Sequence, residues 1–168
     1  VPAHVVDGWR RDPDWVGPAD PCGGLAARAP AGQHEAAMTT HMEAEALLRA
    51  MGERPDEAID LGEAALLLGS FDRPRVGLQR YRDHLAALAD DTAAMLRERG
   101  DGGLADRIAA LNAVIVGRYG YAGDTLTYDD LQNANLLRVI DRRKGLPVAL
   151  GILYLSTAER LGWQMAGL

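Results

Sequence analysis

Cysteine, phenylalanine and long apolar runs are all scarce in this sequence. It has one cysteine, Cys22, and one phenylalanine, and aromatic residues make up 5% of the chain. A single cysteine excludes an internal disulfide, and we expect a reducing, cytoplasmic compartment. The most apolar run, Leu146–Leu155, is far shorter than the ~20 residues that a membrane-spanning helix needs, so we expect a buried helix there and no membrane contact. Val1–Trp9 is broken by polar residues and does not resemble a secretory signal.

Positive charge is in deficit as well. The 18 lysines and arginines face 24 aspartates and glutamates, so the formal net charge is −6 at pH 7. Such a chain lacks the basic face that general binding to nucleic acids or anionic membranes needs, and we expect no nucleic-acid partner. The remaining composition, 48% hydrophobic and 25% charged over 168 residues, is ordinary for one globular domain.

The first 38 residues differ from the rest in their density of helix breakers. They hold five of the eight prolines, with five glycines between them. No apolar period survives so many breakers. We therefore expect an irregular segment over residues 1–38, followed by a helical domain over residues 39–168.

Apolar residues recur at helical spacing through residues 39–168 and predict a mainly helical bundle. Glycines mark the helix ends, Thr40 and Asn133 are the expected caps of two helices, and Pro147 suits the first turn of the last. The predicted helices are Thr40–Met51, Ile59–Leu68, Leu78–Leu96, Gly103–Val116, Ala134–Arg143 and Pro147–Leu161.

A long connection, residues 117–132, separates the fourth and fifth predicted helices. Gly120, Gly123 and the pair Asp129–Asp130 are typical of turns. Three tyrosines, Tyr119, Tyr121 and Tyr128, give this connection apolar surface, which favours a packed loop.

A series of motifs follows in the stretch Tyr119–Leu161. It contains Gly120-Tyr121-x-Gly123, Tyr128-Asp129-Asp130, Asn133, the run Val139–Pro147 with sequence VIDRRKGLP, and Leu153-Tyr154-Leu155. This pattern resembles the SirB-type branch of the transglutaminase-like superfamily, a bacterial branch that often carries tetratricopeptide repeats. The resemblance covers Asp56–Leu168. It implies that the helices form the helical half of an α+β domain, whose sheet would follow Leu168, so that the domain is incomplete at its C-terminus.

The resemblance also implies where a nucleophile would lie. Catalytic members of the superfamily carry a cysteine at the start of the core helix, two residues after a glycine, with a histidine and an aspartate on following strands. A helix N-terminus stabilises a thiolate, and the histidine acts as its base. Matching Gly145 to that glycine places Pro147 at the nucleophile position. We therefore expect no catalytic residues in this chain.

Other chemistry-bearing residues have simple structural explanations. Cys22 has no base near it in sequence, and the mid-helix hydroxyls of Ser156 and Thr157 are expected to bond back to their own helix. His84 lies at the edge of an apolar stripe, as a boundary residue would. His34, His41, Glu43 and Glu45 lack zinc-ligand spacing. We predict no metal and no cofactor.

The most prominent charge feature surrounds the end of the fifth predicted helix. Arg138, Arg142, Arg143 and Lys144 crowd there with Asp141. One interpretation is that these cations complement the helix dipole and aid solubility. The other is contact with an acidic partner or a phosphate, for which the arginine fork is suited. The candidate contact residues are Asn133, Asp141, Arg142 and Arg143.

Three functions remain open at this point. The first is a non-catalytic binding or regulatory module with a protein partner, whose apolar last helix, left uncovered, would also favour a homo-oligomer. The second is a cysteine-type amidase or acyl-transferase, which the superfamily contains. The third is a scaffold similar to helical-repeat adaptors.

Overall fold

A computed structural model describes residues 41–99 and 103–165. All of them belong to one compact unit, Glu35–Leu168. The predicted irregular segment over residues 1–38, including Cys22 and His34, lies outside the described residues, and so does Thr40, the expected cap of the first helix.

The described part is mainly helical, as predicted, with a single pair of very short strands. Three short non-α helices also occur: η1 lies between α1 and α2, and η2 and η3 lie between α4 and α5. In chain order the elements are α1 (His41–Gly52), η1 (Asp56–Ala58), α2 (Leu61–Ser70), α3 (Gln79–Arg99), α4 (Leu104–Asn112), η2 (Ala113–Arg118), β1 (Ala122–Gly123), η3 (Leu131–Asn133), α5 (Leu136–Arg142), β2 (Lys144–Gly145) and α6 (Pro147–Arg160).

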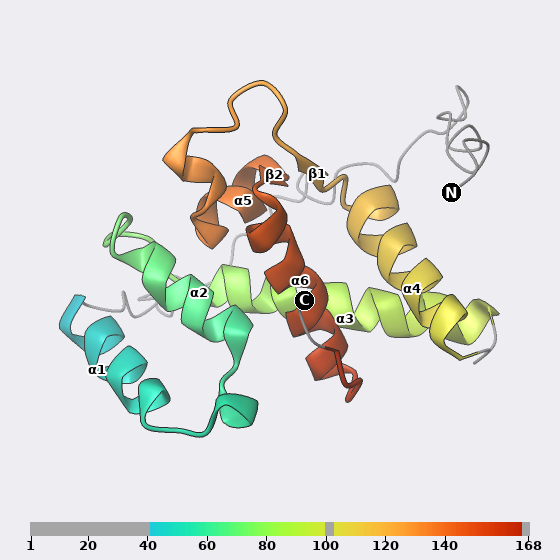
Figure 1. Cartoon of the computed structure of the whole chain (residues 1–168), viewed down its shortest axis with the longest axis horizontal. Helices are drawn as coiled ribbons and strands as arrows, with labels where there is room; N and C mark the ends of the chain where they lie inside the picture. Colours follow the sequence, from blue (N-terminus) through green and yellow to red (C-terminus); the bar gives the residue numbers. More distant parts are fainter. Residues whose placement is uncertain (1–40, 100–102, 166–168) are drawn as a thin grey trace, which may run out of the picture. The chain divides into compact units, whose positions relative to one another are not determined.

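The long helix α3 is the spine on which the other elements pack. Helix α6 crosses it, α4 runs along one end of it, and α2 contacts both α3 and α6, with α1 lying against α2 (Figure 1). The strands β1 and β2 run parallel, with Ala122 opposite Lys144 and Gly123 opposite Gly145. This pairing joins the end of the α4–η2 arm to the short connection between α5 and α6.

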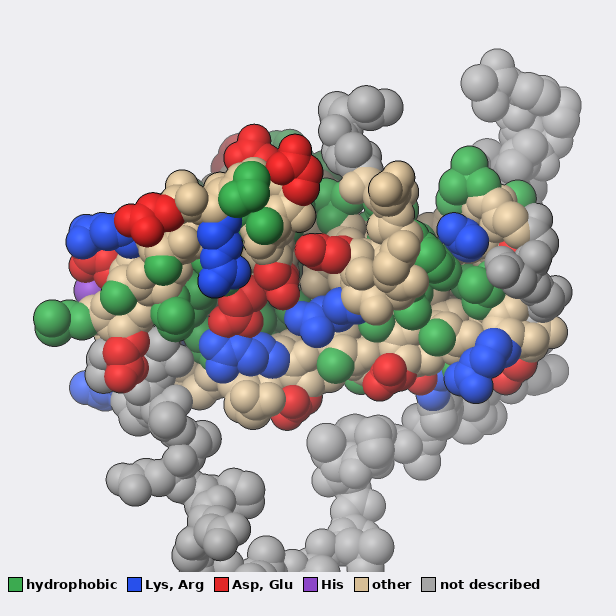
Figure 2. Space-filling model, turned by 90° about the horizontal axis from the view of Figure 1, so that it is seen from below, with side chains coloured by type: hydrophobic (Ala, Val, Ile, Leu, Met, Phe, Trp, Pro, Cys, Tyr) green, Lys and Arg blue, Asp and Glu red, His purple; other side chains and the backbone are tan. Residues whose placement is uncertain are grey.

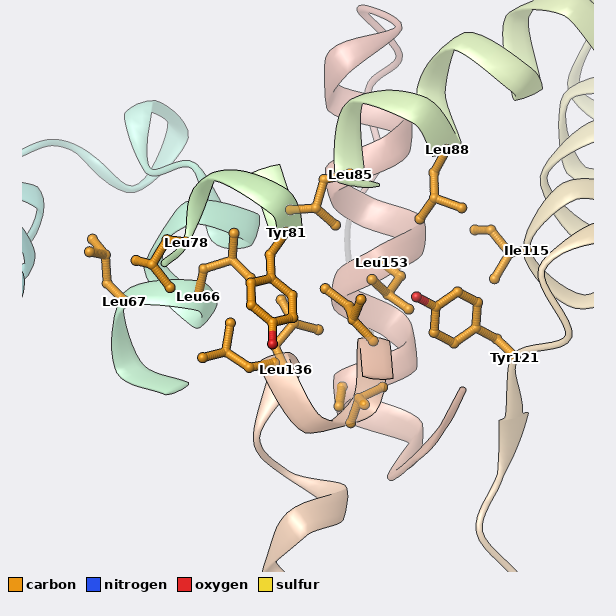
Figure 3. Close-up of a cluster of buried hydrophobic side chains, with 14 of the residues drawn as sticks. Leu66, Leu67, Leu78, Tyr81, Leu85, Leu88, Ile115, Tyr121, Leu136 and Leu153 are labelled. Carbon is orange, nitrogen blue, oxygen red and sulfur yellow. The ribbon is translucent and has the colours of Figure 1, made fainter. Parts of the chain in front are cut away.

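The core lies where α2, α3, α5 and α6 meet. Figure 3 shows Leu153 of α6 between Tyr81 of α3 and Tyr121, which enters from the chain beyond η2, in that view. All three side chains are almost completely buried. Each fully buried leucine contributes about 1.5–3 kcal/mol relative to its exposed state. The largest fully buried side chains are Tyr81, Tyr121, Leu66, Leu67, Leu78, Leu85, Leu88, Leu111, Ile115, Leu136, Leu137 and Leu153.

Two predicted helix starts were placed too early. The second helix begins at Leu61 because the Asp60 carboxylate accepts a hydrogen bond from the Glu63 amide at 2.8 Å and so caps it. The fifth begins at Leu136, capped by Asn135, whose side-chain oxygen accepts from the amides of Leu137 and Arg138. The expected cap, Asn133, instead lies in η3. Helical spacing alone does not fix which polar residue caps a helix.

The fourth predicted helix changes type before it ends. Residues Ala113–Arg118 form a π-helix instead of the last α-turns. The amide of Tyr119 donates to the carbonyl of Val114, five residues earlier, at 2.9 Å. Single turns of π-helix are rare and occur often at functional sites. This one directs the chain towards the short strand β1.

Candidate functional site

Three successive residues at the end of α5 reach three different parts of the fold. Asp141, Arg142 and Arg143 each make side-chain hydrogen bonds to residues at least 18 positions earlier in the chain. Asp141 contacts the segment before α3 and the start of α3, Arg142 contacts the loop after β1, and Arg143 contacts α3 and Tyr121. The predicted contact residues therefore face in different directions.

Asp141 is the centre of an exposed ion-pair cluster. Its carboxylate accepts from Arg73 at 2.6 Å, from the Tyr81 hydroxyl at 3.1 Å and from Arg80 at 3.3 Å. The hydrogen bond to Asp141 is the main cause that raises the pKa of Arg73. This cluster ties α5 to the beginning of α3, and its charges are already paired.

Arg142 and Asn133 are the two predicted residues that the structure brings into direct contact. An Arg142 nitrogen donates to the Asn133 side-chain oxygen at 3.0 Å, and another donates to Asp124 at 2.8 Å. Asp124 is buried and also accepts from the Thr127 hydroxyl and from two loop amides. These bonds hold the pKa of the Asp124 carboxyl well below its usual range, and the bond from the Thr127 hydroxyl is the largest cause.

Asn133 satisfies every polar group it carries inside the protein. Its side-chain nitrogen donates to the Thr127 carbonyl at 2.6 Å, and its own carbonyl accepts from the amide of Leu146 at 2.9 Å, next to the start of α6. The side chain is fully buried. Asn133, Asp124 and Arg142 thus form a structural clasp that holds the loop 124–133 against α5 and α6.

Arg143 is different, because its backbone and its surroundings are both unusual. It caps the end of α5 with φ 59° and ψ 21°, and it is the one residue other than glycine with positive φ among the described residues. Its Nη1 donates towards His84 Nε2 at 2.6 Å and towards the Tyr121 hydroxyl. The guanidinium carbon lies 4.8 Å from the Tyr121 ring centre and 5.5 Å from that of Tyr119. We call these four residues, Arg143, His84, Tyr119 and Tyr121, the Arg143 cluster.

The titratable groups around Arg143 are neutral near pH 7. Burial, with the charge of Arg143 as a second cause, lowers the pKa of His84 from 6.5 to about 4. Burial is also the main cause that raises the pKa of Tyr121 and of Tyr119 to about 12. A general base that works near neutral pH needs a pKa close to 7. The pKa values of His84, Tyr119 and Tyr121 are therefore poorly matched to proton transfer near neutral pH.

The two tyrosines of the Arg143 cluster, Tyr119 and Tyr121, come from the chain just after the π-helix. Tyr119 follows η2 directly, and its hydroxyl donates to Asp91 of α3 at 2.7 Å. Arg118, the last residue of η2, pairs with the same carboxylate at 2.9 Å. The Tyr119 ring meets the His84 ring edge-on, with centroids 5.2 Å apart. The π-helix thus brings Tyr119 and Tyr121 against α3, where Arg143 meets them.

The N-terminus of α6 carries no polar side chain. Leu146 is the cap residue, Pro147 begins the helix, and Val148, Ala149 and Leu150 complete its first turn. Pro147 and Val148 are exposed, Val148 to 66%. Of the two mid-helix hydroxyls, Thr157 bonds back to the Leu153 carbonyl as expected, whereas Ser156 is buried and has no hydrogen-bond partner in the described part of the chain.

The opposite end of α6 borders a hollow of about 640 Å³. Its walls are apolar side chains from the segment before α2, from α6 and from the residues after α6, with acidic residues among them. Figure 2 shows acidic and basic side chains interspersed over one face of the molecule. The residues that line the hollow are Asp56, Glu57, Ile59, Leu61, Leu155, Glu159, Trp163, Gln164 and Met165.

Residues 41–99 and 103–165 hold neither a metal-ligand cluster nor a helix that could span a membrane. No three histidine, cysteine, aspartate or glutamate side chains there are grouped as a metal site would require. In the same stretches, every helix is too short or too polar to span a bilayer.

The sequence patterns did not reveal most members of the Arg143 cluster. His84 and Tyr121 lie 59 and 22 residues away from Arg143 along the chain. Their contact depends on how α3, the π-helix and α5 pack, which no spacing within one element encodes. The available signals were the three tyrosines of the connection 117–132 and a histidine at the border of an apolar stripe.

Comparison with known proteins identifies the family. A sequence profile of the transglutaminase-like superfamily matches residues 79–168, which is more than half of the 168-residue chain. The chain belongs to this superfamily. That membership sets aside the alternative of an unrelated helical scaffold.

Individual relatives add little about activity. A Vibrio cholerae protein named UPF0162 protein is 33% identical to this chain over 113 residues, which is 67% of this chain and 41% of the relative. Proteins of the same name from two strains of Xylella fastidiosa are 28% identical over 112 residues, 67% of this chain and 39% of each relative. The chain thus spans less than half of the length of these curated relatives. No solved structure matches it.

Proposed function

We propose that this chain is a non-catalytic member of the transglutaminase-like superfamily, of its SirB-type branch, and that it acts as a binding or regulatory module for a protein partner. The observation that carries this proposal is the start of α6. From the resemblance to catalytic members of the superfamily we expect the nucleophile at position 147, which here is a proline at the first helical position of α6. Proline offers neither a thiol nor a hydroxyl that could attack a carbonyl.

The neighbouring groups support the same conclusion. The first turn of α6 consists of Pro147, Val148, Ala149 and Leu150, and none of these side chains can act as a nucleophile or a base. His84, the one imidazole in the Arg143 cluster, has a pKa of about 4; its Nε2 accepts a hydrogen bond from Arg143 and lies 2.7 Å from the Tyr121 hydroxyl oxygen. These features favour recognition over acyl transfer.

An activity screen tests this proposal. The purified chain and its Cys22→Ala variant would be assayed for hydrolysis of activated esters and small amides, and for amine incorporation into a glutamine-containing peptide. We expect both proteins to match the rate of a buffer blank. Cys22→Ala is the matched control because Cys22 is the only cysteine in the sequence.

Two outcomes of this screen would count against the proposal. Turnover that disappears in Cys22→Ala would favour the alternative of a cysteine-type amidase or acyl-transferase. Turnover that persists in that variant would reveal a different nucleophile and would also reject a purely binding role.

A further inference from the structure

The Arg143 guanidinium keeps part of its hydrogen-bonding capacity free for a ligand. Its Nη1 donates towards His84 and Tyr121. Its Nε and Nη2 donate to none of the residues that the structure describes, and the side chain is only partly buried. We infer that the Arg143 cluster is a binding site for a compact oxyanion, a carboxylate or a phosphate group. This inference rests on the proposed function, because both assign binding, and not catalysis, to this surface.

The free edge has the geometry that this ligand class needs. A guanidinium is planar, and the N–H groups of Nε and Nη2 point the same way along one edge, so they can donate in parallel to two oxygens of one anion. With Nη1 held by His84 and Tyr121, the group is fixed in orientation before a ligand arrives. The Tyr119 and Tyr121 rings, within 5.5 Å of the guanidinium carbon, add cation–π contacts that also restrain it.

The charge of Arg143 has no acidic partner among the described residues. The carboxylates around the cluster are already committed to other cations. Asp141 pairs with Arg73 and Arg80, Asp124 pairs with Arg142, and Asp91 pairs with Arg118. The groups that do contact Arg143, an imidazole and a phenol, are uncharged near pH 7.

A partly buried cation without a counter-ion is costly to maintain, since burial penalises charge. An incoming oxyanion would supply the missing charge and fill the two free donors together. The net charge of −6 for the whole chain makes a general attraction for anions implausible, so the site would select by local geometry.

The backbone at the cluster is unusual on both sides. Arg143 adopts a left-handed conformation, φ 59°, which a non-glycine residue holds only when its surroundings compensate the cost. Tyr119 and Tyr121 are brought in by the π-helix Ala113–Arg118. Unusual backbone geometry concentrates at functional sites. Here two such features converge on the guanidinium whose edge is free.

Nuclear magnetic resonance titration of the chain tests this inference directly. Sodium acetate and sodium phosphate would be added in separate experiments near neutral pH, with total ionic strength held constant by chloride. The readouts would be the Arg143 Nε–H signal and the ring signals of His84 and Tyr121. We expect saturable shifts of these signals with at least one of the two anions. Acetate as the tighter ligand would assign the site to carboxylates, and phosphate as the tighter ligand would assign it to phosphoryl groups.

Two variants distinguish a specific site from general charge effects. Arg143→Gly removes the guanidinium at a position whose backbone suits glycine, and we expect it to weaken anion binding by about tenfold or more. Arg138→Gln is the matched control, because it removes a half-buried arginine of α5, the helix that Arg143 caps, and this arginine donates to Gln132 and contacts no aromatic ring in the described structure. It should change the affinity by less than about twofold. Circular dichroism would confirm that both variants fold.

The inference would be overturned by linear, non-saturating shifts with both anions in the unmodified chain. Equal loss of binding in Arg143→Gly and Arg138→Gln would overturn it as well. Neither result bears on whether the chain has turnover, and turnover in the activity screen would not abolish a saturable anion site, so the two proposals can fail separately.

Discussion

The guanidinium of Arg142 lies 2.8 Å from a carboxylate oxygen of Asp124, and this pair joins α5 to the loop that follows β1. The Asp124 side chain is only 3% exposed, whereas that of Arg142 is 30% exposed. A buried carboxylate that loses its cation is left with an unpaired charge. The clasp formed by Asp124, Asn133 and Arg142 should therefore stabilise the loop less when Arg142 is replaced.

We predict that Arg142→Gln lowers the midpoint of thermal unfolding by more than roughly 5 °C, because it leaves Asp124 without its cation. Differential scanning calorimetry would measure this. The control is Arg138→Gln, an arginine of α5 with a single side-chain hydrogen bond to Gln132, for which we expect a change within about 2 °C. Equal effects of the two substitutions would show that the clasp adds nothing to stability.

Replacement of two glycines by alanine, one before α6 and one inside it, should change the free energy of unfolding in opposite directions. A methyl group on Gly145 would lie 2.7 Å from a Val139 methyl carbon and 3.2 Å from the Asn133 carbonyl oxygen, whereas one on Gly151, inside α6, would meet nothing within 4 Å. We expect Gly145→Ala to lower the free energy of unfolding by about 1–3 kcal/mol through overpacking. Gly151→Ala should raise it by about 0.5–1 kcal/mol through helix propensity. Urea titrations would measure both, and a stabilising Gly145→Ala would contradict the close packing described for β2.

The left-handed backbone of Arg143 gives a prediction that separates conformation from contacts. Arg143→Gly and Arg143→Ala both remove the guanidinium, but only glycine adopts φ 59° without steric cost. We expect the glycine variant to be more stable than the alanine variant by about 1 kcal/mol, measured as the difference between their free energies of unfolding in urea. Equal stabilities would mean that the backbone relaxes out of the left-handed region once the side chain is gone.

The free energy of unfolding should decrease as the pH is lowered from the ordinary pKa of His84, 6.5, to its lowered value of about 4. Between these two pH values His84 is protonated in the unfolded chain but not in the folded protein. The unfolded state therefore binds more protons, and lowering the pH shifts the equilibrium towards unfolding. We expect His84→Gln to lose less stability than the unmodified chain from about pH 7 to about pH 4. Denaturant midpoints across this range would measure the effect, and identical pH profiles would refute it.

The lowered pKa of the Asp124 carboxyl acts in a more acidic window. Its contribution to stability is present above the ordinary carboxyl pKa and is lost only as the pH falls towards the lowered value. The effects of His84 and Asp124 can therefore be separated by the pH at which each variant departs from the unmodified chain.

Helix content and the identity of the core were predictable because they follow from local patterns. The stripe Leu78, Tyr81, Leu85 and Leu88 is buried on α3 as its spacing predicted. Pro147 begins α6 as predicted, whereas α5 ends with the left-handed cap residue Arg143, two positions before Gly145, the glycine that was expected to end it. These features depend on residues within about one or two helical turns of each other.

The contacts of the candidate residues were not predictable in the same way. Helical spacing did not show that Asn135 caps α5 in place of Asn133, and a stretch as short as Ala113–Arg118 does not let spacing distinguish a π-helix from an α-helix. The packing of distant elements determines which residues are contacted by Asp141, Arg142 and Arg143. A run of charged residues at a helix end has the same sequence pattern whether its side chains are hydrogen-bonded, ion-paired or free to bind a ligand.

The π-helix also constrains how the length of this chain can vary. Each residue of an α-helix turns the chain by about 100°, and the wide turn in Ala113–Arg118 already holds one residue more than an α-turn, so one further residue inserted there would rotate everything beyond it. Tyr119 would then no longer reach Asp91, and β1 would lose its register with β2. Insertions should thus be poorly tolerated in the six residues before Tyr119.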